Sequence, residues 1–213
     1  MVYLGEAISL ETHHRVLKLL RLLEDRPIPG VRNLHPAYCS LMVVFDPVRQ
    51  DHETVQEVLR KYVGEMDSVT LPSPRTVEIP VCYGNEYGPD LNDLAALHGI
   101  SPERVIELHS GADYIVYFVG FVPGFAYLGG LPSEIATPRL ATPRQRVPVG
   151  SVAIGGDQTG IYPIETPGGW RIIGTTPMTI FDAEHPSMSR LGIGDMVRFK
   201  PVPPDQFSAL QTK

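Results

Sequence analysis

The chain has 213 residues, of which 43% are hydrophobic and 20% are charged, and its formal net charge is -6 at pH 7. These proportions are typical of a globular protein with one or two domains and exclude a disordered chain. Neither an apolar run near the roughly 20 residues that span a bilayer nor a basic-then-apolar leader occurs, so we expect a cytoplasmic protein that contacts no membrane. Positions 51 to 113 hold twelve acidic and four basic residues, which disfavours a nucleic-acid groove because such a groove needs a basic stripe.

The first eighty residues alternate between strand-like and helix-like hydrophobic patterns. The patterns predict a strand, a helix, two strands and a second helix, in this order: residues 2–8, 10–24, 31–34, 40–45 and a run that follows the N-cap Asp51. This β-α-β-β-α order predicts a small α+β domain of the ferredoxin-like, split βαβ type over residues 1–75. Its fourth strand is either Thr76–Val81, after the polar linker 66–75, or absent because the domain ends at that linker.

Residues 76–213 have a different hydrophobic pattern, which predicts a mostly-β domain. Two short helices, 90–98 and 102–109, precede a strongly apolar strand at 114–119. Short β runs then recur at a spacing typical of a small barrel: 147–149, 152–154, 160–163, 170–173, 178–181 and 196–199. A closed barrel is expected because closure removes the sheet edges.

Residues 120–174 contain eleven of the twenty glycines and no lysine. Aromatic residues are interleaved with these glycines, and disordered segments lack them. The segment is therefore predicted to be ordered, with bends that glycine permits, and ordered loops of this kind usually bind something.

Candidate binding residues within this segment fall into three groups. In the run FVPGFAYLGGL (121–131), backbone N–H groups around Gly124 and Phe125 either cradle a carboxylate or phosphate, or belong to a hairpin that packs aromatic rings into the barrel. Three arginines follow in two Thr-Pro-Arg repeats and just behind them, at Arg139, Arg144 and Arg146. Their guanidinium groups suit anion recognition; alternatively, they lie in a surface loop and pair with the acidic middle of the chain or with another protein of the same complex.

The third group lies between residues 155 and 171 and contains polar side chains that suit the orientation of a small amide or carboxylate: Gln158, Tyr162, Glu165 and Arg171. Glu165 and Tyr162 are the catalytic candidates, and Glu165 is a base only if burial raises its pKa. Gln158 and Tyr162 fit cross-strand packing equally well. The histidines are scattered singly and the two cysteines lack Cys-x-x-Cys spacing, so no metal site is expected.

Three stretches are specific when taken together: FVGFVPGFAYLGGLP (118–132), TPRLATPRQRVPVGSVAIGGDQTGIYPIETPGGW (137–170) and GIGDMVRF (192–199). They resemble the allophanate hydrolase subunit 1 family, also called the kinase-inhibitor KipI family, whose bacterial members include the B subunit of the ATP-dependent 5-oxoprolinase. The resemblance runs from about residue 2 to residue 202. It implies a small α+β domain followed by a cyclophilin-like β-barrel domain.

The resemblance also implies a function and partners. The chain would be a non-autonomous component that, with a homologous-fold C subunit and a third protein, hydrolyses 5-oxoproline to L-glutamate at the expense of ATP bound by the complex. One alternative is a KipI-like inhibitor of a sensor histidine kinase. The other is a carboxyltransferase component of the urea or allophanate type, which works with a biotin carrier.

Two features depart from the family pattern. Members generally begin with a further strand before the segment that matches VYLGEAIS, so we expect an open sheet edge that a partner covers. Thr175 stands where an arginine is common, and this weakens the expected anion site if that arginine is functional.

Overall fold

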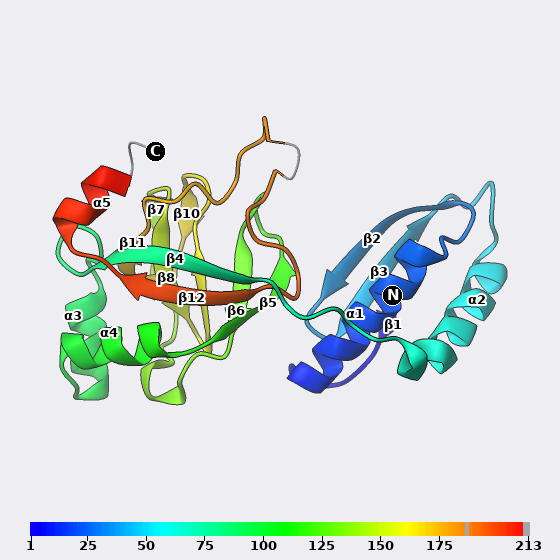
Figure 1. Ribbon diagram of the computed structural model, residues 1–213, viewed down its shortest axis with the longest axis horizontal. Helices are drawn as coiled ribbons and strands as arrows, with labels where there is room; N and C mark the ends of the chain where they lie inside the picture. The colour runs from blue at the N-terminus through cyan, green and yellow to red at the C-terminus, as the bar shows by residue number, and fades with distance from the viewer. Residues whose placement is uncertain (186–187, 211–213) are drawn as a thin grey trace. The chain divides into compact units, whose positions relative to one another are not determined.

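A computed structural model describes residues 1–185 and 188–210. The chain divides into two compact units, Met1–Ser73 and Pro74–Lys213. Figure 1 shows that the first unit combines a small sheet with two long helices, whereas the second consists mainly of strands.

The first unit contains a three-stranded antiparallel sheet in the order β1-β3-β2. Its elements are β1 (Val2–Tyr3), α1 (Leu10–Asp25), β2 (Val31–Ala37), β3 (Ser40–Phe45), α2 (His52–Glu65) and the 3-10 helix η1 (Met66–Ser68). The predicted β-α-β-β-α order is present. The predicted strand 2–8 is too long, because the chain bends at residues 6 and 7 and Ser9 then caps α1 by accepting a hydrogen bond from the Thr12 backbone N–H (3.1 Å).

The helices of the first unit cover one face of its sheet. Leu19 of α1 and Leu41 of β3 are fully buried in the same apolar core, to which α2 also contributes. The neighbours of Leu41 on the opposite face of β3, Met42 and Val44, are partly exposed. This alternation follows the two-residue period of a strand with one buried face.

The second unit contains a closed seven-stranded barrel in the order β11-β4-β12-β5-β6-β9-β8. Its strands are β4 (Thr76–Tyr83), β5 (Tyr114–Val119), β6 (Ala126–Gly129), β8 (Ser151–Gly155), β9 (Gln158–Ile161), β11 (Arg171–Thr175) and β12 (Met196–Pro201). Neighbouring strands are antiparallel except β12 and β4, which are parallel.

The other elements of the second unit lie outside the barrel wall. β7 (Arg144–Val147) and β10 (Thr166–Gly168) form a two-stranded antiparallel ribbon. The helices are α3 (Leu91–His98), α4 (Pro102–Gly111), α5 (Pro204–Leu210) and the 3-10 helix η2 (Ser133–Ile135). Ser101 caps α4 as predicted, since its side chain accepts a hydrogen bond from the Arg104 backbone N–H (3.2 Å).

The structure corrects several strand predictions. Of the two alternatives for Thr76–Val81, the structure shows that the first domain ends at the linker: this segment pairs with β12 as part of β4 in the barrel, and the end of β4 pairs with β11. Residues 178–181 form no strand; Phe181 makes one isolated bridge to Ser189. The run 147–149 lies later than the observed β7, and β6 and β10 were not predicted as strands. The ferredoxin-like and cyclophilin-like assignments of the two units stay predictions.

The barrel interior holds one buried polar chain centred on His109. The His109 Nδ1 and Nε2 atoms lie 2.8 Å from the Tyr83 hydroxyl and 2.9 Å from the Thr159 hydroxyl. Thr159 donates to the Ala153 carbonyl (3.0 Å), so His109 donates to Thr159 from Nε2 and accepts from Tyr83 at Nδ1. Burial lowers the pKa of His109 to about 3, and the imidazole is therefore neutral in the folded protein.

Candidate functional site

A separate apolar cluster lies on the outer face of the barrel beneath the β7–β10 ribbon. Successive residues of β8 point to opposite faces, so Val152 and Ile154 fill the barrel interior while Ala153 packs in the outer cluster. The outer cluster consists of Phe125, Val147, Ala153, Tyr162, Trp170 and Ile172. Gly155 is needed beside it, because a Cβ there would lie 2.5 Å from the Trp170 ring.

Phe125 is the centre of the aromatic packing in the outer cluster. Its ring makes edge-on contacts with the rings of Tyr127, Tyr162 and Trp170, at centroid separations of 4.8, 5.2 and 5.5 Å. The Arg139 Cζ atom lies 5.8 Å from the centroid of the Trp170 ring, within the range of a cation–π interaction. Arg139 is exposed whereas Phe125, Tyr162 and Trp170 are buried, so a cationic side chain covers a buried aromatic cluster here.

Arg144 is held at the same cluster by a partly buried ion pair. Its Nη2 atom donates to Asp90 Oδ1 at 2.6 Å, and the side chains of Arg144 and Asp90 are 29% and 7% exposed. Asp90 Oδ2 accepts a second bond from the Ile172 backbone N–H of β11 (2.7 Å). The carboxylate therefore joins the start of α3 to the barrel and fixes the orientation of Arg144.

Both arginines act on the same phenol. Burial raises the pKa of Tyr162, and the positive charges of Arg139 and Arg144 oppose part of that rise. Burial also raises the pKa of Tyr127, where only the charge of Arg139 opposes it. Both phenols consequently stay protonated near neutral pH, so Tyr162 suits a hydrogen-bond donor or an acid rather than a base.

The structure brings five groups of this region together: Arg139, Arg144, Tyr162, Phe125 and Trp170. The first four were predicted site residues. Their packing around one cluster is a structural fact, whereas their binding role stays a prediction. For Arg144 the alternative interpretation also holds, because its partner Asp90 belongs to the acidic middle of the chain.

The remaining predicted residues have other surroundings. Arg146 and Glu165 are largely exposed and form a loose ion pair, with the Arg146 Nε and Glu165 Oε1 atoms 3.7 Å apart. Glu165 is 56% exposed, so the burial on which its predicted role as a base depends is absent. Arg171 donates from Nε to the Pro138 carbonyl (3.1 Å), and Gln158 pairs with Gly155 in the β8–β9 hairpin.

The turn between β5 and β6 is a hairpin, as one of the two interpretations of FVPGFAYLGGL predicted. Its rings pack in the outer cluster rather than in the barrel interior. Gly124 has a φ of 81°, and a Cβ there would lie 2.6 Å from Phe181 Cβ, so backbone conformation and packing both require glycine. Phe121 also has a left-handed φ of 71° although its side chain is 60% exposed.

Two departures of the sequence can be located. The Thr175 hydroxyl donates to the Tyr87 carbonyl (2.8 Å), which gives this side chain a structural role. β1 lies at one edge of the first sheet. Asp90 was missed as a site residue because it lies 54 positions from Arg144; its position at the start of the predicted helix 90–98 was the local signal.

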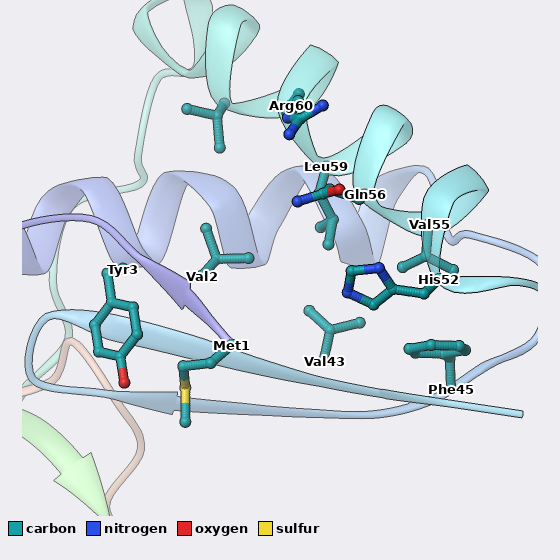
Figure 2. Close-up of a pocket in the computed structure, with 11 residues that line it drawn as sticks. Met1, Val2, Tyr3, Val43, Phe45, His52, Val55, Gln56, Leu59 and Arg60 are labelled. Carbon is teal, nitrogen blue, oxygen red and sulfur yellow. The ribbon is translucent and has the colours of Figure 1, made fainter. Parts of the chain in front are cut away.

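The first unit contains a cavity of about 380 Å³ between its sheet and α2 (Figure 2). Apolar side chains from β1, β3 and α2 form most of its lining, and α2 adds the polar side chains of His52, Gln56 and Arg60. No aspartate or glutamate is among its lining residues. The cavity suits an apolar group but offers no carboxylate for hydrolysis.

Neither a metal cluster nor a membrane span is found in the parts of the chain that the structure describes. Residues 1–185 and 188–210 contain no group of three or more His, Cys, Asp or Glu side chains suited to a metal ion. No helix within these ranges is both long and apolar enough to cross a bilayer.

Comparison with known proteins identifies the family of this chain. The family model "Carboxyltransferase domain, subdomain C and D" matches residues 1–191. The chain is 54% identical over 170 residues to the B subunit of 5-oxoprolinase from Haemophilus influenzae, covering 80% of this chain and 76% of the relative. It is 40% identical over 209 residues to the B subunit of 5-oxoprolinase from Bacillus subtilis, covering 93% and 87%. The chain therefore belongs to the carboxyltransferase C and D family that includes this 5-oxoprolinase component.

Solved structures agree with the fold. The crystal structure of TTHA0988 matches with a TM-score of 0.84 and 37% identity, covering 95% of this chain but only 39% of that chain. The urea carboxylase of Kluyveromyces lactis matches with a TM-score of 0.77 at 19% identity, covering 96% of this chain and 21% of the enzyme. The second likeness concerns the fold alone.

Proposed function

We propose that this chain is a non-autonomous component of a 5-oxoprolinase that hydrolyses 5-oxoproline to L-glutamate. The observation that carries the proposal is the 40–54% identity, over most of the chain, to proteins named as the B subunit of 5-oxoprolinase. The outer cluster supports it, since it combines guanidinium groups with a protonated phenol and packed aromatic rings. These groups suit a small planar amide that bears a carboxylate.

The reaction needs activation because a lactam is a stabilised amide that water attacks slowly. Transfer of the ATP γ-phosphoryl group to the lactam oxygen makes the ring carbon electrophilic; water then adds, and cleavage of the C–N bond and release of phosphate yield glutamate. Cationic donors stabilise the charge that develops on oxygen, and a phenol hydroxyl can orient the ring. In this scheme Arg139 and Arg144 supply the positive charge that holds the anionic substrate, and Tyr162 supplies the hydroxyl.

The proposed enzyme also requires ATP and two further proteins. The part of the chain that the structure describes presents no phosphate-binding P-loop sequence, and we assign ATP to the assembled complex rather than to this chain. The chain would be inactive alone and would assemble in the cytoplasm with a homologous-fold C subunit and a third protein.

One observation favours a second candidate, a KipI-like inhibitor of a sensor histidine kinase. Phe121 is held in a strained left-handed conformation with most of its ring exposed, and strained exposed aromatics are typical of binding surfaces. In this case the purified chain slows autophosphorylation of a cognate kinase at micromolar concentration and Phe121→Ala abolishes the effect. A carboxyltransferase role requires instead a biotinylated carrier.

A deletion strain tests the principal proposal. Lysate of cells lacking this chain should lose ADP release that depends on 5-oxoproline, and purified chain should restore it. Full activity in the deletion lysate would contradict the proposal. Restoration by chain carrying Phe121→Ala would show that the inhibitor surface is not needed for the enzyme.

A further inference from the structure

We propose that Arg144 binds the carboxylate of the substrate through its second guanidinium nitrogen, with Arg139 at the entrance of the same subsite. This inference rests on the proposed function, which supplies a substrate with a carboxylate. It also goes beyond that function, because it places substrate recognition on this chain.

The two terminal nitrogens of the Arg144 guanidinium have different surroundings. One nitrogen, Nη2, is bound to Asp90, whereas Nη1 is buried and has no hydrogen-bond partner among residues 1–185 and 188–210. Buried donors are nearly always satisfied, and an unmet one costs about 1–3 kcal/mol, more when it is charged. Nη1 is therefore a donor prepared for an acceptor from outside the described chain.

The charges around Arg144 favour a negatively charged acceptor. Arg144 is already neutralised by Asp90, but Arg139 makes no ion pair within the described residues and lies over Trp170. Both guanidinium groups are close enough to Tyr162 to lower its pKa. A ligand group that meets Arg144 and Arg139 thus experiences net positive charge, which selects an anion.

Aromatic rings and the partly exposed Arg144 side chain form the surroundings of the proposed subsite. The Trp170 and Tyr127 rings contact each other edge to face at 5.7 Å and Trp170 is 4% exposed, so Arg139, rather than an open ring face, forms the outer rim of the subsite. The Arg144 side chain as a whole is 29% exposed although its Nη1 atom is buried, so binding requires a small shift that brings Nη1 to the ligand. Asp90 holds the other side of the guanidinium and limits that shift.

Arg144→Lys is the informative variant because a lysine keeps the charge beside Asp90 but cannot bond both Asp90 and a carboxylate with a fixed fork. In the assembled enzyme we expect its KM for 5-oxoproline to rise about 10–100-fold, the range for one charge-assisted hydrogen bond. The KM for ATP should stay unchanged. Arg139→Gln should raise the KM for 5-oxoproline in the same direction.

The matched control is Arg198→Lys on β12, since Arg198 also pairs with a carboxylate, Asp113, but in an exposed position (2.5 and 3.0 Å). Equilibrium binding of labelled 5-oxoproline to the complex gives a readout that does not depend on turnover. Weaker binding by Arg144→Lys at an unchanged unfolding midpoint, with Arg198→Lys like wild type, supports the subsite. If both variants bind and turn over 5-oxoproline like wild type, the subsite is wrong although the role in the complex stands; if the wild-type chain supports no turnover with its partners, the proposed function itself fails.

Discussion

Removal of the Asp90 carboxylate should destabilise the second unit strongly. In Asp90→Ala, the partly buried Arg144 loses its counter-ion and the Ile172 backbone N–H of β11 loses its acceptor. Breaking a buried ion pair costs about 3–5 kcal/mol, which we reduce to about 2–3 because Arg144 is partly exposed, and an orphaned buried N–H adds about 1–3. The free energy of unfolding should therefore fall by about 3–6 kcal/mol.

Trp170 allows the stability of the second unit alone to be measured. It is the single tryptophan of the chain and is 4% exposed in the outer cluster, so its fluorescence during urea unfolding reports on the second unit. The Asp90→Asn variant should lose less stability than Asp90→Ala. Its amide oxygen can still accept a hydrogen bond from the Ile172 backbone N–H. Asp113→Ala, which breaks the exposed pair with Arg198, should have a far smaller effect. A loss below about 1 kcal/mol for Asp90→Ala would refute the assigned role of this carboxylate.

Two further predictions concern the core. The lowered pKa of buried His109 means that the unfolded chain binds more protons below pH 6.5, so stability should fall as the pH drops, by about 2–3 kcal/mol for this group between pH 7 and pH 4.5. Urea midpoints that do not change across this range, or a His109→Gln variant with the same pH slope, would contradict this. Gly155→Ala should cost about 1–3 kcal/mol and shift the Trp170 emission, because its Cβ meets the indole ring at 2.5 Å; a wild-type spectrum and midpoint would show that the ring moves away freely.

The sequence correctly predicted those elements that depend on interactions between residues close together in the chain. The apolar run of β5 and the helix caps Asp51 and Ser101 were predicted because side-chain pattern and capping act within a few residues. Pairing between distant strands was not predictable in this way. Thr76–Val81 was recognised as a possible strand, but its partner β12 lies more than ninety residues later.

The candidate site shows the same division. The glycine and arginine content directed attention to one segment, in which Arg139, Arg144, Tyr162 and Phe125 lie near Trp170; their binding role stays a prediction. Residue type alone did not separate Arg144, which is anchored by a distant aspartate, from Arg146, which is exposed beside Glu165. That distinction depends on tertiary contacts, which no local pattern encodes.

The central claim is that this chain is required for hydrolysis of 5-oxoproline. The most direct measurement is the rate of glutamate formation from 5-oxoproline and ATP by the purified partner proteins, with and without stoichiometric amounts of this chain. We predict formation of glutamate and ADP in equal amounts only when the chain is present. Equal rates with and without the chain would contradict the account.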